Sequence, residues 1–261
     1  MHKIVNKPTD RLPASSTCAS GVLPTTLSAG VLALLLVYCA QAQSTDSPLT
    51  ADQWQEVRLG QDIPPNTFSF DATDATTNDK PVLRIESNAS MSMMARAIDV
   101  DLARTPWLCW QWRVNRVLDR ADMTERFGDD YAARLYVSMS IPETDQSLGL
   151  RLQLGLARSI WGDQVPDAAI NYVWDNRQPV GTTLPNAYTD RVTMVVAQTG
   201  GEYVGQWVNQ SRNLADDIET LMTPSATPVQ IALAADTDNT GERVIAEFAN
   251  IRFAAEEANC Q

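Results

Sequence analysis

Two short acidic stretches of this chain contain residues that could carry out chemistry. Asp129 and Asp130 are adjacent, and Asp236 and Asp238 alternate in the stretch Asp236-Thr-Asp-Asn-Thr-Gly241. Two close carboxylates push the pKa of one of them upward, as in a general acid–base pair. Adjacent strand residues point to opposite faces, so a turn or an ion pair with Arg134 is the alternative interpretation of Asp129 and Asp130. The catalytic candidates are Asp129, Asp130, Arg134 and Tyr136.

The second acidic stretch is also a candidate metal site. Asp236-x-Asp238-x-Thr240-Gly241 is similar to the oxygen-rich start of a calcium loop, in which alternating side chains bind the ion and a glycine forms the turn. The glutamate that would close an EF-hand is Glu247, but it lies in a predicted strand. The candidate is therefore a calcium site of another type at Asp236 and Asp238, and the alternative is a polar hairpin turn. No other cofactor is expected.

Aromatic and guanidinium groups supply candidates for ligand binding. Trp174 and Trp207 are each close in sequence to amide or guanidinium groups, which suits stacking on a sugar ring, although most tryptophans of β-sandwiches lie in the core. Arg212 can clamp a carboxylate or phosphate, or pair with Asp216 across one helical turn. The full set of ligand-binding candidates is Arg134, Asn171, Trp174, Trp207, Arg212, Asn213, Asp236, Asp238 and Asn239.

Composition excludes several classes of function. The only histidine, His2, lies in a predicted leader, so the processed chain has none, which excludes Ser-His-Asp and Cys-His nucleophiles and zinc sites built on imidazole. The formal charge of −12 becomes about −14 after processing, because three cations and one anion leave with the leader. This acidic balance argues against nucleic acid, whose phosphates require a basic surface.

The first 42 residues are predicted to be a signal peptide. The apolar run 31–37 is followed by Ala40-Gln-Ala42, an A-x-A site that places cleavage after Ala42. This run is shorter than a membrane span of about 20 residues, so a membrane anchor is the weaker alternative. We expect a disordered linker over 43–53, one domain over 54–254, a tail over 255–261, and a periplasmic or secreted location without a membrane span.

Two cysteines remain after processing. Cys109 lies in a predicted strand and Cys260 in the tail. An oxidising compartment would allow a disulfide between them, but their separation in space does not follow from sequence. Two interpretations stay open, namely a Cys109–Cys260 disulfide and two unpaired cysteines.

Short apolar or alternating segments predict a mainly β protein. The predicted strands cover 82–86, 91–98, 107–114, 132–141, 148–157, 170–174, 191–198, 203–207, 229–235 and 243–253. One helix is predicted over 214–222, with Asn213 as its cap and Pro224 beyond its end. Strands joined by turns without βαβ alternation favour an antiparallel β-sandwich or jelly roll with this one short helix.

The alternation within two strands predicts which side chains face the core. In 107–114, the face with Trp110 and Trp112 is the apolar one. In 132–141, Leu135, Val137 and Met139 form the apolar face, which places Arg134, Tyr136 and Ser138 together on the polar face.

Several of these motifs occur in an order that is similar to one bacterial family. They are Trp110-Gln-Trp112, Asp129-Asp130-x-x-Ala133-Arg134-x-Tyr136-Val137, Asn171-Tyr-x-Trp174, Ser211-Arg212-Asn213 with Asp216, and Asp236-Thr-Asp-Asn-Thr-Gly241. From about Trp54 to Phe253 the chain resembles the bacterial domain-of-unknown-function family numbered 3047. The resemblance implies an exported β-sandwich domain and carries no established activity.

The sequence therefore predicts a periplasmic domain that binds a glycan or another small polar ligand. Its motivation is that unusual polar residues recur near strand ends, where loops gather functional groups. Two alternatives stay open: a glycan hydrolase or lyase that works without histidine, and a structural protein of the cell envelope in which the same groups form a buried network.

Overall fold

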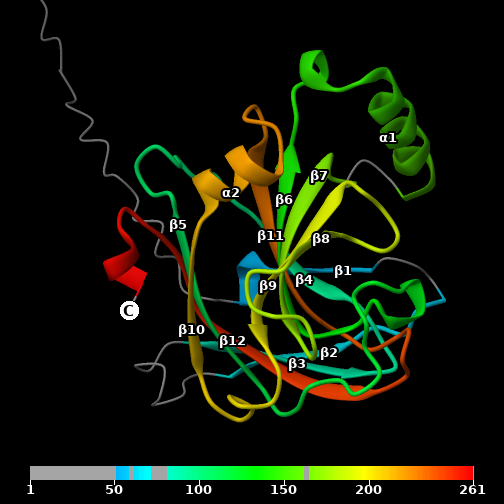
Figure 1. The fold of residues 1–261 in the computed structure, drawn as a ribbon, viewed down its shortest axis with the longest axis vertical. Helices are drawn as coiled ribbons and strands as arrows, with labels where there is room; N and C mark the ends of the chain where they lie inside the picture. Colours follow the sequence, from blue (N-terminus) through cyan, green and yellow to red (C-terminus); the bar gives the residue numbers. More distant parts are fainter. Residues whose placement is uncertain (1–50, 59–61, 72–80, 162–164, 261) are drawn as a thin grey trace, which may run out of the picture. The chain divides into compact units, whose positions relative to one another are not determined.

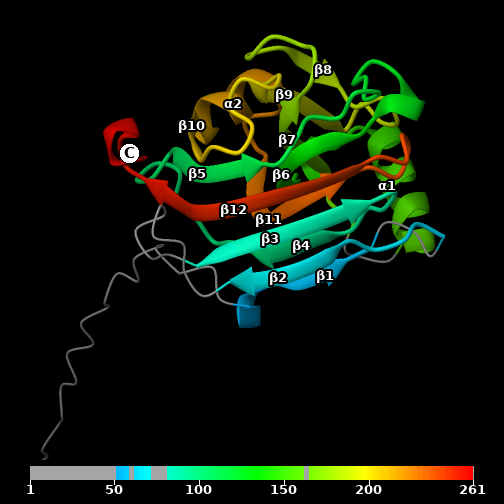
Figure 2. The same cartoon turned by 90° about the horizontal axis from the view of Figure 1, so that it is seen from below.

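The chain folds into two sheets whose apolar faces share one core (Figures 1 and 2). The computed structural model describes residues 51–58, 62–71, 81–161 and 165–260. The predicted leader 1–42 and most of the predicted linker lie outside the described residues. The predicted mainly β, two-sheet sandwich is confirmed.

The larger sheet has seven strands. In spatial order they are β1 (Gln55–Val57), β4 (Met93–Ala97), β11 (Thr227–Asp236), β6 (Tyr131–Ser140), β7 (Ala168–Asp175), β9 (Val192–Thr199) and β8 (Thr183–Pro185). The pair β7–β9 is parallel, and the other pairs of this sheet are antiparallel. This order places β6 at the centre of the sheet, between β11 and β7.

The smaller sheet has five antiparallel strands. They are β10 (Val208–Asn213), β5 (Trp107–Val114), β12 (Arg243–Ala254), β3 (Val82–Asn88) and β2 (Thr67–Asp71). Helix α2 (Leu214–Leu221) continues directly from β10, and Figure 1 shows it at the end of that strand. The Asn213 side chain accepts a hydrogen bond from the Asp216 amide, so the predicted cap and helix are confirmed.

Aromatic side chains join the two sheets across the core. Trp110 and Trp112 of β5 face inward, as the alternation predicts. Tyr172 lies 5.4 Å from Trp110, and Trp174 lies 5.8 Å from Trp112, between ring centroids. Leu135 of β6 faces the same core, so the opposite faces of β6 and β7 form the outer face of the seven-stranded sheet.

Two predicted strands are wrong. Segment 148–157 lies in helix α1 (Leu148–Trp161), where the Ser147 hydroxyl accepts a hydrogen bond from the Leu150 amide. Its alternating leucines mimic a strand, but leucine, arginine, glutamine and alanine are strong helix formers. Segment 203–207 forms a turn, and the strand begins at Val208. The short strands β1, β2 and β8 are absent from the predictions.

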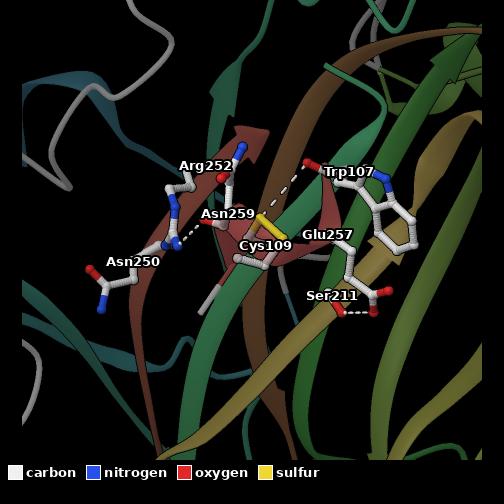
Figure 3. Close-up of a disulfide and its surroundings, with 8 residues drawn as sticks. Trp107, Cys109, Ser211, Asn250, Arg252, Glu257 and Asn259 are labelled. Atoms are coloured by element: carbon white, nitrogen blue, oxygen red, sulfur yellow. Dashed lines mark hydrogen bonds between the residues drawn. A yellow bond between two sulfur atoms is a disulfide. The ribbon is translucent and has the colours of Figure 1, made fainter. Parts of the chain in front are cut away.

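The C-terminal residues are fixed to the smaller sheet by a disulfide (Figure 3). Cys109 of β5 is bonded to Cys260, with 5.2 Å between the Cα atoms, which settles the open choice in favour of a bridge. Cys260 belongs to the short 3-10 helix Glu257–Cys260, whose Glu257 accepts a hydrogen bond from Ser211 of β10. Within the described residues, no helix is both long and apolar enough to cross a membrane.

Candidate functional site

Arg134 is the centre of a buried polar cluster on the outer face of the seven-stranded sheet. It projects from β6, and its guanidinium forms an ion pair with Asp236 at the end of β11. With its amide oxygen toward Arg134, Asn171 of β7 accepts hydrogen bonds from Nε (3.0 Å) and Nη2 (2.8 Å). Three neighbouring strands therefore each supply one member, and strand pairing fixes their positions.

Two tyrosines enclose the guanidinium of Arg134. Its Cζ atom lies 4.6 Å from the Tyr131 ring centroid and 4.8 Å from that of Tyr136. Cation–π contacts strengthen when water is excluded, as it is here, since Arg134 is almost fully buried. The Arg134 guanidinium is thus held in a fixed orientation at the centre of the cluster.

The electrostatics of the cluster follow from its burial. Burial alone lowers the pKa of Arg134, but the attraction of Tyr136, Asp236 and Asp129 outweighs it and raises the pKa above the usual value. Burial raises the pKa of Asp236 well above its usual range, because Asp238 and Asp130 add to the effect and Arg134 opposes it only in part. Burial also raises the pKa of Tyr136, which disfavours its ionised form.

Asp129 and Asp130 point to different partners. Asp129 accepts hydrogen bonds from the Tyr131 hydroxyl (2.9 Å) and from Asn186 Nδ2 (2.8 Å). Asp130 accepts from the backbone amides of Asn239 (3.3 Å) and Thr240 (2.6 Å). No ion pair joins either of them to Arg134 among the described contacts, since that partner is Asp236. Their main contacts therefore hold loops in place.

The turn after β11 brings a third carboxylate to the cluster. In the part of the chain that the structure describes, Asp130, Asp236 and Asp238 each offer an oxygen within 4.8 Å of the others. Gly241 closes this turn at φ 66°, a conformation that favours glycine, and its amide donates to the Thr237 carbonyl. Glu247 does not belong to this site, because it accepts hydrogen bonds from Arg84 and Arg113 in the smaller sheet.

An exposed aromatic side chain lies beside this turn. Tyr188 is 51% exposed, and its hydroxyl accepts a hydrogen bond from Asn239 Nδ2 (3.1 Å) and donates one to the Arg126 carbonyl (2.8 Å). The Arg126 guanidinium lies 5.6 Å from the Tyr188 ring centroid, and the adjacent Phe127 is 88% exposed. We call Arg126, Phe127, Tyr188, Asp238 and Asn239 the Tyr188 rim.

Sequence reasoning did not single out Arg126, Phe127 or Tyr188. Each lies in a connecting segment without strand periodicity, so no alternation marks it. The available signal was composition, because Asn186-Ala-Tyr188 follows Pro185 in a polar turn, and turns of this type carry binding residues.

Four predicted ligand-binding residues lie outside this cluster. Trp174 is 1% exposed between the sheets, so neither ring face is open to a sugar. Trp207 precedes β10, and the Arg113 guanidinium of the smaller sheet lies 4.6 Å from its ring centroid. Asn213 caps helix α2.

Arg212 belongs to a second polar group, at the end of β10. Its guanidinium donates to both oxygens of Asp217 (3.0 and 2.5 Å), so the alternative pairing with Asp216 is wrong and the partner is the next residue. The Tyr172 hydroxyl also donates to Asp217 (2.6 Å), and burial followed by the charge of Asp217 raises the Tyr172 pKa. Helix α2 thereby links β10 to β7 of the other sheet.

The comparisons with known proteins identify a family. Residues 52–252 match the family described as "Protein of unknown function (DUF3047)". The chain belongs to this family. The resemblance inferred from the motifs is thus confirmed. No curated protein matches the chain significantly.

Three solved structures are similar at low identity. The family 30 carbohydrate-binding module of the cellulosomal cellulase Cel9D-Cel44B of Clostridium thermocellum is 10% identical, with 78% of this chain and 99% of that chain covered and a TM-score of 0.34. The xyloglucanase domain of NopAA, a type three effector from Sinorhizobium fredii, in complex with cellobiose, is 8% identical, with 79% and 96% covered and a TM-score of 0.39. A structure from a comparison of family 12 glycoside hydrolases is 10% identical, with 78% and 98% covered and a TM-score of 0.37.

Proposed function

We propose that this protein is exported to the periplasm or secreted and binds a glycan at the Tyr188 rim. The observation that carries the proposal is an exposed aromatic ring, Tyr188, whose hydroxyl is hydrogen-bonded to the amide of Asn239, the residue after Asp238. Glycan sites combine an aromatic face for the apolar side of a sugar ring with a few polar groups for its hydroxyls.

The position of Tyr188 is fixed by several contacts. Its amide donates to Asn186 Oδ1 (3.0 Å), and Asn186 in turn donates to Asp129. Arg126 Nε donates to the Ala187 carbonyl (2.9 Å), next to the ring. A ring that is already ordered loses little conformational entropy when it binds a ligand, which favours a recognition role.

Asp238 and Asn239 supply the polar part of the rim. Both side chains are partly exposed, and both follow β11 at the edge of the buried cluster. A carboxylate accepts hydrogen bonds from sugar hydroxyls, and an amide can both accept and donate. Arg134 and Asn171 are buried, so they are not open to a large ligand.

Export has support from the covalent structure. The Cys109–Cys260 disulfide suits an oxidising compartment, since cytosolic proteins keep their cysteines reduced. The signal-peptide pattern of residues 1–42 points to the same location.

The catalytic alternatives have less support. Asp129 and Asp130 accept hydrogen bonds from different partners, so they do not form the paired acid–base device that a hydrolase would use. Tyr136 lies beside Arg134, as a lyase would require, but burial raises the Tyr136 pKa, whereas a tyrosine base requires a lowered one. The purely structural alternative accounts for Arg134, but it gives no reason for an exposed, ordered Tyr188.

An oligosaccharide array tests the proposal. The purified protein should bind a subset of acidic or neutral oligosaccharides, and Tyr188→Ala should lose that binding. Tyr203→Ala is the matched control, because Tyr203 is 41% exposed in the turn before β10 and lies outside the rim. Absence of binding across the array, or equal binding by the two variants, would refute the proposal.

A further inference from the structure

We propose that Asp130, Asp236 and Asp238 form a calcium site where β6 begins and β11 ends. The proposed calcium site shares Asp238 with the Tyr188 rim, but its other two carboxylates, Asp130 and Asp236, are buried, and its test uses calcium without a glycan. Its basis is one geometric fact, one unpartnered buried oxygen and one charge imbalance, all in the described part of the chain.

The geometry suits one hard cation. One oxygen from each carboxylate lies within 4.8 Å of the others. Calcium binds oxygen at about 2.3–2.6 Å, so two oxygens on opposite sides of one ion are about 4.6–5.2 Å apart. The three oxygens can therefore share a calcium ion. The site offers only oxygen, which favours calcium or magnesium over zinc or copper.

A buried carboxylate oxygen in this site has no hydrogen-bond partner. Asp236 is 3% exposed, and its Oδ2 pairs with Arg134, but its Oδ1 has no partner in the structure. The Thr240 hydroxyl is likewise buried and without a partner, and the Thr240 amide donates to Asp130 in the same site. Buried polar atoms are almost always satisfied, so this oxygen requires a positive partner, which is either a proton shared with the Asp238 carboxyl group or a cation.

The charges of the site are not balanced by the protein. Counted as ionised groups, three carboxylates and one guanidinium, that of Arg134, carry a formal charge of −2. Uncompensated buried charge is costly, and a divalent cation neutralises this excess.

The turn that carries Asp238 is held by hydrogen bonds to two serines in and directly after β3. The Thr237 side chain exchanges a hydrogen bond with the Ser87 hydroxyl (2.7 Å), and the Thr237 amide donates to the Ser90 carbonyl (3.2 Å). Both serines are buried. Strand β3 and the residues after it therefore hold the turn that carries Asp238 in place.

Calcium titration with paired variants tests the site. The purified protein is dialysed against EGTA, and calcium binding is measured by calorimetry and by the shift in unfolding temperature. The wild type should bind one calcium ion per chain and unfold at a higher temperature with it. Asp238→Asn should weaken binding by at least about tenfold, since even outer-shell changes cost that much. Asp238 is partly exposed, so this variant should keep its fold, as circular dichroism will check.

Asp216→Asn is the matched control. Asp216 is exposed in helix α2, outside the site, and its replacement should leave calcium affinity unchanged. The proposal is overturned if calcium produces neither heat nor a shift in the wild type, or if Asp238→Asn and Asp216→Asn bind calcium equally.

Discussion

Replacement of Arg134 by methionine should strongly destabilise the protein. Methionine keeps much of the side-chain volume but leaves Asp236 and Asn171 without their buried partner. Removal of one member of a buried ion pair costs about 3–5 kcal/mol in free energy of unfolding. Urea unfolding followed by tryptophan fluorescence, in EGTA, measures this loss against a typical domain stability of about 5–15 kcal/mol.

Two further variants test the reasoning. Arg120 is 64% exposed and lies 3.9 Å from Glu242, so Arg120→Met should cost less than about 1 kcal/mol. Asp236→Asn removes the carboxylate that Arg134→Met leaves without its partner. The Arg134→Met/Asp236→Asn double variant should therefore be more stable than the sum of the two single losses predicts. A loss below about 1 kcal/mol for Arg134→Met, or strict additivity, would refute the assignment of a buried, coupled pair.

Three other predictions concern the rest of the molecule. Cys260→Ser opens a disulfide that joins residues 151 apart in sequence, and it should lower the free energy of unfolding by about 5 kcal/mol, measured by urea unfolding. Tyr172→Phe removes the hydrogen bond to Asp217 and should cost about 1.5–3 kcal/mol by the same assay, whereas an unchanged midpoint would contradict the bond. The native pKa values of Tyr131, Tyr136 and Tyr172 lie above those of the unfolded chain. Near pH 10 and above, the unfolded chain loses these protons before the folded protein does, so the folded protein loses stability as the pH rises. The urea midpoint should therefore be lower at about pH 11 than at about pH 8, and an equal midpoint at the two pH values would contradict the shifts.

The sheets were largely predictable because alternation carries most of the information. Strand β5 was predicted with its observed bounds, and its inward Trp110 and Trp112 follow from period two alone. Helix α1 was missed because leucine at every second position satisfies the strand pattern, while helix propensity decides the outcome. Period alone cannot separate these two signals in a short apolar segment.

Trp174 shows a second limit of periodicity. Strand β7 is buried along its whole length, so both of its faces are enclosed and alternation does not distinguish them. The amide of Asn171 faces Arg134, whereas Trp174 faces the opposite, inner side. Asn171 and Trp174 are close in sequence and were therefore predicted to share one site, but they lie on opposite faces of the sheet.

The site was predictable in its residue types but not in its pairing. The alternation places Arg134 on a polar face, and Asp236 and Asp238 stay candidate calcium ligands, but the ion pair between Arg134 and Asp236 joins residues 102 apart in sequence. Strand order determines that join, because β11 lies next to β6. Tyr188 reaches the site through a loop, whose course has no periodic signal.

The location of ligand binding is the central claim, and hydrogen–deuterium exchange with the strongest oligosaccharide of the array tests it most directly. We expect the ligand to protect the backbone amides of 186–190 and 237–241, which form the turns around Tyr188 and Asn239. Protection confined to β10 and the turn around Trp207, with no change at 186–190 and 237–241, would contradict the account.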